Sequence, residues 1–345
     1  MRNGPCTGRG RFQGRTKMNK TMVAILKVLD RASDITGSRE ISRKLMAHGI
    51  DLTERTVRYH MRILDERGYT EVYGKEGRKI TDKGRSEMRN SNVSEQLGFV
   101  SARIESLSYL TTLKLKAMKG TAILNVSFIP AEKVSEAVVI LRRFFSSPFA
   151  MCNRMIIASA GEQVGDILVP DGKVGLGTVC SITINGLFLK AGIPVTSRYG
   201  GVLEIADSAP KRFTSLISYE GSSIDPLEVF TRGKMTDVTG CINNGSGSIL
   251  ASFREIPVVC LNEAVTLSKK MAAKGIGGVL SIGKPNSPFL DIPVGIDKVG
   301  MVVVGGLNPV AFLDEAGILT HSRAMSALVD YERLRSFDEI AEEMS

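Results

Sequence analysis

The C-terminal three quarters of the chain repeats itself, and this repeat restricts the possible folds more than any other feature. Three short segments recur in the same order at an offset close to 125 residues, and a fourth recurs at a slightly shorter one. Ordered matches at nearly one spacing indicate a duplicated structural unit. The matched segments are ILNVSF at 123–128 with ILASF at 249–253, AGI at 191–193 with 316–318, SR at 197–198 with 322–323, and VG at 174–175 with 294–295.

We therefore predict an α/β domain over residues 97–345, built from two related halves at about 97–210 and 220–337. Each half is expected to run strand, helix, strand, glycine-rich strand and helix, with the first helices at 131–145 and 261–274. Alternation of this kind favours a mixed sheet covered by helices. Two related halves commonly enclose a cleft or present a surface for dimerisation.

Charge separates the first quarter of the chain from the rest. The formal net charge is +9, and residues 1–94 hold 21 Lys and Arg against 11 Asp and Glu. The remaining residues hold 24 against 25, so the basic excess lies entirely in the first quarter. This asymmetry predicts a polyanionic partner for the N-terminal segment.

A small DNA-binding domain is predicted over residues 18–90. The apolar spacing from Met22 to Leu29 gives a first helix, and Ser38 and Thr53 are potential N-caps of a second and a third. Two short strands around the Gly-Lys-Glu-Gly turn at 74–77 follow, and Thr81 caps another short helix. Three helices and a hairpin are the order of a winged helix-turn-helix domain.

The segments that flank this domain are expected to be irregular. Residues 1–17 hold one large apolar side chain, Phe12, so we expect a disordered basic arm. Such an arm is compatible with DNA contact and equally with a start site placed upstream of the true one at Met18. The polar run at 91–96 is expected to be a linker.

The third helix carries an apolar stripe on one face and a cationic stripe on another. A solvated face normally mixes both signs of charge, whereas this one combines arginines with an aromatic residue. It suits a helix whose first two turns lie in a major groove, with the following hairpin as a wing that contacts phosphates. The candidate DNA-contacting residues are Ser38, Arg39, Arg55, Thr56, Arg58, Tyr59, Arg62, Lys75, Arg78 and Lys79.

The sequence carries no catalytic or metal-binding signature. The five cysteines are widely spaced without a C-x-x-C pair, and no Walker loop, G-x-S-x-G or H-E-x-x-H occurs. Neither a bound cofactor nor enzymatic activity is therefore expected. No apolar run approaches the roughly 18 residues that a membrane helix needs, so we expect a cytoplasmic protein without membrane contact.

Each half contains a Ser-Arg pair after its glycine-rich strand and helix, and these pairs are candidates for ligand binding. Two equivalent arginines could hold the two ends of a small dicarboxylate. The alternative, that each arginine is a structural group that caps a helix or pairs with an acid of its own half, stays open. The candidate effector-binding residues are Asn185, Ser197, Arg198, Tyr199, Asn308, Ser322 and Arg323.

Four segments resemble the archaeal NrpR-type nitrogen-regulatory repressors over about residues 20–337. GSREISRKL at 37–45 and DLTERTVRYHMRILDERGY at 51–69 resemble the winged helix of that family. GIPVTSRYGGVLEI at 192–205 and PVGIDKVGMVVVGGLNP at 293–309 resemble its regulatory domain. Some members carry two regulatory domains in tandem, whereas this chain has the length for one.

The resemblance implies a repressor of nitrogen-fixation and nitrogen-assimilation genes in a methanogenic archaeon. Such a protein binds a palindromic operator as a homodimer and is released by 2-oxoglutarate. A second chain of the same type is the expected source of further regulatory domains. Two other functions stay open: a winged-helix regulator whose large domain is a protein-interaction platform without a small ligand, and an enzyme that acts on a small carboxylate.

Overall fold

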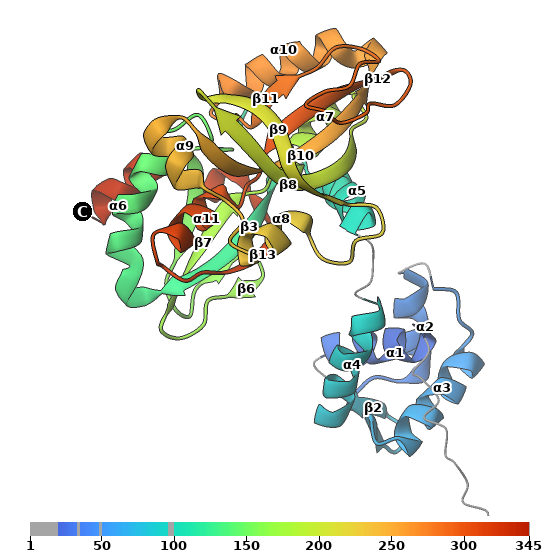
Figure 1. The fold of residues 1–345 in the computed structure, drawn as a ribbon. Coiled ribbons are helices and arrows are strands. Elements are labelled where there is room, and N and C mark those ends of the chain that lie inside the picture. The colour runs from blue at the N-terminus through green and yellow to red at the C-terminus, as the bar shows by residue number, and fades with distance from the viewer. Residues whose placement is uncertain (1–19, 33–34, 48–49, 96–99, 345) are drawn as a thin grey trace, which may run out of the picture. The chain divides into compact units, whose positions relative to one another are not determined.

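The computed structural model describes residues 20–32, 35–47, 50–95 and 100–344, which form two compact units that divide near residue 97. The predicted arm at 1–17 lies outside the described residues. Each unit is considered by itself below (Figure 1).

The N-terminal unit has the predicted order of a winged helix. Thr53 caps the third helix by accepting a hydrogen bond from the backbone N–H of Thr56, and the Thr81 hydroxyl accepts one from Gly84 at the start of the last helix. Apolar residues of the first three helices form one buried core. The elements are α1 (Lys20–Arg31), α2 (Ser38–Ala47), α3 (Glu54–Glu66), β1 (Thr70–Tyr73), β2 (Gly77–Ile80) and α4 (Asp82–Glu95).

Two local predictions for this unit differ from the structure. Ser38 is the first residue of α2, and its hydroxyl donates to Glu54 on α3, so it links two helices instead of capping one. The polar run predicted as a linker is helical up to Glu95, because α4 continues through it. A polar composition alone did not distinguish a helix from a loop at this place.

The C-terminal unit contains two five-stranded sheets. Every strand pair in the described residues is antiparallel, so the predicted mixed sheet is wrong. One sheet has the order β13 (His321–Asp330), β3 (Thr121–Pro130), β7 (Lys173–Val179), β4 (Arg154–Ala158) and β14 (Arg335–Ser336). The other has the order β11 (Val279–Ile282), β12 (Lys298–Val304), β10 (Gly247–Pro257), β8 (Thr196–Ala206) and β9 (Ala209–Ser218).

Helices cover these sheets as the repeat requires. In Figure 1, α10 lies along the sheet that contains β11 and β12, and α6 lies beside α11. A two-stranded hairpin, β5 (Gln163–Val164) with β6 (Ile167–Leu168), projects from the first half. The helices are α5 (Val100–Leu110), η1 (Ala131–Lys133), α6 (Val134–Phe145), α7 (Ile182–Lys190), α8 (Pro226–Arg232), α9 (Val238–Asn244), η2 (Val258–Cys260), α10 (Leu261–Ala272), α11 (Asn308–Glu315), η3 (Tyr331–Arg333) and α12 (Phe337–Glu343).

The internal repeat is present in the structure, with two matches corrected. The strand pairs equate Ile123 with Leu250 and Ser127 with Arg254, so ILNVSF at 123–128 does not align residue for residue with ILASF at 249–253. The strand register equates β7 with β12, so the partner of Lys173-Val174-Gly175 is Lys298-Val299-Gly300 at an offset of 125, and not the segment at 294–295. Likewise β3 corresponds to β10, α6 to α10, α7 to α11 and β8 to β13. Val294 and Gly295 lie in the loop before β12.

One late strand of each half pairs with the first strand of the other half. β8 follows α7 in the first half but pairs with β10, and β13 follows α11 in the second half but pairs with β3. Both large apolar cores accordingly contain residues of both halves. The two halves therefore fold as one domain, which the repeat alone did not reveal.

This exchange predicts that neither half folds alone. Residues 98–218 produced by themselves would leave β3 without β13 and β8 without β10, exposing strand edges and apolar surface. We expect each half to lack a cooperative thermal transition by circular dichroism, and the two halves produced together to form a folded 1:1 complex by size-exclusion chromatography. Cooperative unfolding of residues 98–218 alone would contradict the exchange.

Candidate functional site

A groove of about 820 Å³ in the N-terminal unit brings most of the predicted DNA-contacting residues together. It lies between the start of α2, the first turns of α3 and the hairpin. Eight of the ten predicted residues line it: Ser38, Arg39, Arg55, Arg58, Tyr59, Arg62, Lys75 and Arg78, together with Gly37, Glu54, Gly74 and Gly77.

Glu54 organises the cationic side chains at one end of this groove. Its carboxylate accepts hydrogen bonds from Arg58 and Ser38 and lies 3.8 Å from Nε of Arg39. The hydrogen bond from Arg58, followed by that from Ser38, holds the pKa of Glu54 below its usual value. Since Arg39 is 92% exposed, it keeps its freedom to reach a phosphate.

Other cations of the groove remain available for an external anion. Arg55 is exposed and forms no hydrogen bond or ion pair with the described residues, and Lys75 at the hairpin turn is exposed as well. Arg62 lies 6.0 Å from the ring centroid of Tyr59 and 3.7 Å from Glu66. An aromatic ring beside guanidinium groups gives this helix a face suited to a nucleic acid.

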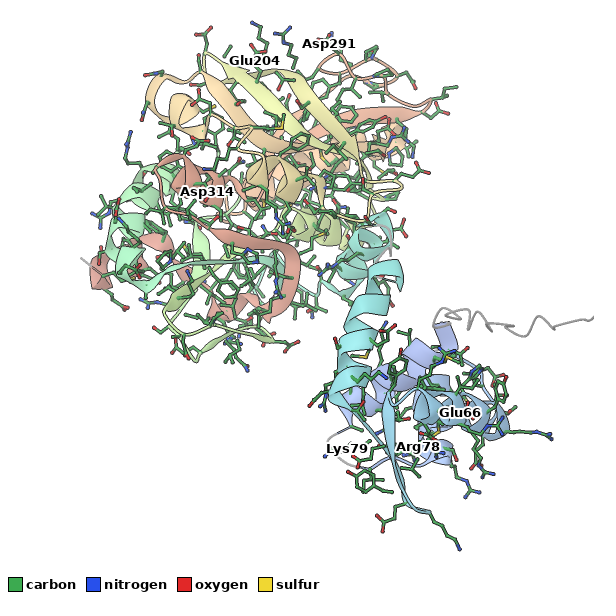
Figure 2. The ribbon with its side chains drawn as sticks, turned by 60° about the horizontal axis from the view of Figure 1, so that its bottom comes forward. Glu66, Arg78, Lys79, Glu204, Asp291 and Asp314 are labelled. Atoms are coloured by element: carbon green, nitrogen blue, oxygen red, sulfur yellow. The ribbon has the colours of Figure 1, made fainter. Side chains whose placement is uncertain are left out.

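Three of the predicted DNA-contacting residues, Arg78, Thr56 and Lys79, differ from the others in their contacts or position. Arg78 turns back from the hairpin and donates from Nε to both oxygens of Asp65, at 2.8 and 3.0 Å, so it holds the hairpin against α3. Thr56 takes part in the capping of α3 through Thr53. Lys79 is exposed but does not line the groove, and Figure 2 shows it and Arg78 on opposite sides of the hairpin.

The C-terminal unit buries one arginine that the sequence analysis did not select. Arg254 on β10 is 0% exposed, and its guanidinium donates to Ser252 Oγ, to both oxygens of Ser181 and to Asn185 Oδ1. Every one of these acceptors is neutral. Burial lowers the pKa of Arg254 to about 10, so the group still carries its charge at neutral pH.

Two predicted effector residues meet at this arginine. Asn185 on α7 accepts from Arg254 and donates from Nδ2 to Ser197 Oγ at 3.1 Å. Ser197 also pairs with Arg254 across β8 and β10. At the equivalent place in the other half, Ser322 pairs with Ser127, and their hydroxyls lie 2.9 Å apart.

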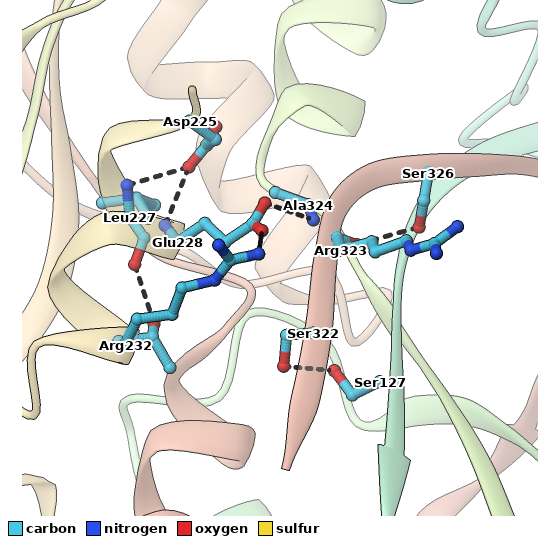
Figure 3. Close-up of polar contacts among 10 residues, drawn as sticks. Ser127, Asp225, Leu227, Glu228, Arg232, Ser322, Arg323, Ala324 and Ser326 are labelled. Carbon is cyan, nitrogen blue, oxygen red and sulfur yellow. Dashed lines mark hydrogen bonds and ion pairs between the residues drawn. The ribbon is translucent and has the colours of Figure 1, made fainter. Parts of the chain in front are cut away.

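The two predicted arginines do not meet. Arg198 lies over the ring of its neighbour Tyr199 and 3.8 Å from Glu255, an acid of the other half and not, as the alternative had it, of its own half. Arg323 is exposed, and Figure 3 shows its side chain extending away from Glu228. Neither arginine lines the groove of the N-terminal unit, the cavity between the starts of α7 and α11, or the hollow beside Leu113 and Leu187. The idea of two arginines that grip one dicarboxylate therefore gains no support from their geometry.

Asn308 has a role within the fold. It is fully buried at the start of α11, accepts from the backbone N–H of Leu250 and donates to the Leu250 carbonyl at 2.9 Å. Thr183 holds the backbone of Ile123 in the same way in the first half. Since both side chains tie the helix to the first strand of the same half, the amide of Asn308 is occupied.

The sequence does contain a signal for Arg254. Arg254 and Glu255 are adjacent charged residues that end a run of apolar and small residues on a predicted buried strand. A charge at such a position requires compensation or function. The repeat obscured it, because the corresponding residue of the first half is the small Ser127.

Each of the two units matches a known protein family. The family described as NrpR regulatory domains NRD1 and 2 matches residues 97–336, and the family described as Ribonuclease R winged-helix domain matches residues 23–88. The chain is thus a winged-helix protein with a regulatory domain of the NrpR type. It belongs to the NrpR family.

Relatives and a solved structure agree with this assignment. The global nitrogen regulator NrpRI of Methanosarcina mazei is 35% identical over 92% of this chain and 98% of its own length. The global nitrogen regulators NrpR of Methanococcus maripaludis and Methanocaldococcus jannaschii are 34% and 31% identical, and the chain spans only 54% and 55% of their lengths. A crystal structure of a nitrogen repressor-like protein from Methanococcus jannaschii has a TM-score of 0.60 and 29% identity, covering 69% of this chain and 98% of that one.

Among the residues that the structure describes, no helix is both long and apolar enough to cross a bilayer.

The position of Asn308 predicts a loss of stability when it is replaced. Asn308→Ala should lower the free energy of unfolding by at least about 2 kcal/mol, because the buried N–H and carbonyl of Leu250 lose their partner. Urea unfolding measures this, with the exposed Asn244→Ala as a control expected within about 0.5 kcal/mol of wild type. Equal stability of the two variants would show that Asn308 is free to serve a ligand.

Proposed function

We propose that this protein is a DNA-binding repressor of nitrogen-fixation and nitrogen-assimilation genes, released from its operator by 2-oxoglutarate. One observation carries the proposal: a groove lined by arginines on a winged helix occurs in a chain that is 35% identical, over nearly the whole length of both, to a protein named global nitrogen regulator. The groove supplies the DNA-binding surface and the relatives supply the physiological context.

In the proposed complex, the first two turns of α3 enter the major groove of DNA. Arg55 and Arg62 point from this helix with side chains that can reach base edges or phosphates, and an Arg contact to guanine is the commonest specific one. Lys75 on the hairpin turn and Arg39 at the start of α2 contact phosphates on either side. Arg58 stays hydrogen-bonded to Glu54, and its guanidinium contacts the DNA from that fixed position.

The protein is proposed to act as a homodimer on a palindromic operator, since two winged helices on adjacent half-sites bind far more tightly than one. The Methanococcus relatives are nearly twice as long as the segment they share with this chain. A second chain of the NrpR type is proposed as a source of further regulatory domains. In this proposal, the second copy of the chain and the second NrpR-type chain both contact the C-terminal unit.

Variants of α3 test the DNA interface. Arg55→Ala and Arg62→Ala should each weaken operator binding by about 1–3 kcal/mol if the side chain reads a base, whereas Lys75→Ala should mainly reduce the salt dependence. Fluorescence anisotropy with labelled promoter fragments measures both effects. Lys270→Ala, an exposed cation on α10, is the control. Unchanged affinity in a folded Arg55→Ala/Arg62→Ala double variant would place the DNA contact elsewhere.

The effector is tested on the full chain. 2-Oxoglutarate that binds only the folded protein should raise its melting temperature and, in the same concentration range, release the labelled operator. Glutarate and succinate serve as matched dicarboxylates that lack the keto group. No melting shift and no release would favour a protein-interaction platform, and consumption of the compound would reveal an enzyme.

A further inference from the structure

The groove of the N-terminal unit holds a carboxylate among its cations. Among the described residues that line it, Glu54 is the one acid beside five arginines and a lysine. The hydrogen bonds from Arg58 and Ser38 keep the pKa of Glu54 below its usual value, so the carboxylate is ionised at neutral pH. Its side chain is 32% exposed, and a negative charge here weakens the attraction for the phosphates of any DNA. A residue that opposes binding in this way needs a compensating role.

Glu54 holds Arg58 in place through a closed set of three hydrogen bonds. Arg58 Nη2 donates to Glu54 Oε1 at 2.5 Å, and Ser38 Oγ donates to the same oxygen at 3.0 Å. Arg58 Nε donates to Ser38 Oγ at 3.3 Å and completes the set. Because Ser38 begins α2 while Glu54 and Arg58 belong to the first turns of α3, the position of the guanidinium is fixed relative to both helices.

The far end of this guanidinium is free for an external acceptor. Nε and Nη2 face Glu54 and Ser38, whereas Nη1 donates to no residue of the described chain. The Arg58 side chain is 66% exposed and lines the groove. The end formed by Nη1 and Nη2 presents parallel N–H groups, and this is the arrangement that matches O6 and N7 of guanine.

The other two arginines on this face of α3 are held less firmly. Arg55 forms no hydrogen bond or ion pair with the described residues. Arg62 lies 3.7 Å from Glu66, a carboxylate that is itself 66% exposed. Mobile cations of this kind suit phosphates, which occur along the whole DNA backbone. An arginine that is ordered before binding loses less side-chain entropy on binding and reaches its acceptor in one geometry.

We propose that Glu54 is a positioning residue that determines specificity: it holds Arg58 in the geometry that reads the edge of a guanine and keeps this arginine away from phosphates. The inference rests on the proposed function, and it names the residue pair of that same groove that distinguishes an operator from other DNA.

The effect on specificity passes through Arg58. The charge of Glu54 by itself weakens binding to every sequence alike, so it lowers both affinities and leaves their ratio unchanged. A released Arg58 has two different effects. It loses the fixed geometry for a base in the operator, and it gains a phosphate contact on DNA of any sequence. Both effects lower the ratio of operator affinity to affinity for unrelated DNA.

The variant Glu54→Gln, made in the full chain, tests this role. The amide keeps the size of the side chain and removes the charge that holds Arg58. Fluorescence anisotropy compares a promoter fragment that the wild type binds with a shuffled fragment of equal length. We expect the ratio of the two affinities to fall about tenfold, as for the loss of one base contact. Binding to the shuffled fragment should become tighter, with a salt slope steeper by about one.

Arg58→Ala shows whether Glu54 acts through this arginine. It should lower the same ratio, and adding Glu54→Gln to Arg58→Ala should lower it no further, because the two residues act as one unit. When each base pair of the promoter fragment is substituted in turn, both single variants should lose discrimination at the same G·C pair.

Two further variants serve as a control and as a second test. Glu66→Gln makes the same change on the same helix, next to Arg62 and outside the groove, and should leave the ratio as in wild type. Ser38→Ala removes the hydroxyl that bonds both Glu54 and Arg58 and should lower the ratio in the same direction as Glu54→Gln. Circular dichroism checks the fold of each variant, and Ser38→Ala decides the matter if Glu54→Gln does not fold.

The outcomes separate this inference from the proposed function. Wild-type protein that prefers the promoter fragment, with an equal preference in Glu54→Gln, overturns the role of Glu54 while the DNA-binding function stands. A loss in Glu54→Gln that recurs in full in the Arg58→Ala background overturns the positioning of Arg58. Wild-type protein that binds neither fragment, or both equally, overturns the proposed function itself.

Discussion

The exchange of β8 and β13 between the two halves is the constraint on which the rest of the C-terminal unit depends. The first strand of each half, β3 or β10, pairs on one side with a strand of its own half and on the other with β13 or β8 of the opposite half. Because neither sheet is complete without both halves, the first turns of α7 and α11 are brought together. The small cavity between them is a direct consequence of this exchange.

The two halves of the repeat differ at one buried position, that of Arg254. Equivalent positions hold Thr183 and Asn308 for the same structural purpose, but Arg254 stands where the first half has Ser127. A buried guanidinium surrounded by neutral acceptors costs stability that a serine would not.

The sequence predicted elements whose signals are local and failed where the decisive contact is distant. The apolar spacing of α3, the cap at Thr53 and the glycine-flanked turn fixed the winged helix, because each depends on residues within one or two turns. For the same reason, most of the predicted cationic residues line one groove. Strand exchange gave no local signal, so Arg198 and Arg323 were paired by position in the repeat although the fold separates them.

Hydrogen–deuterium exchange of the full chain, with and without a promoter fragment that it binds, tests the central claim most directly, since it follows the backbone without any substitution. The account predicts slower exchange on DNA binding in peptides that cover the start of α2, the first turns of α3 and the hairpin turn, with little change in α10. Binding of the fragment with altered exchange only in the C-terminal unit would contradict it.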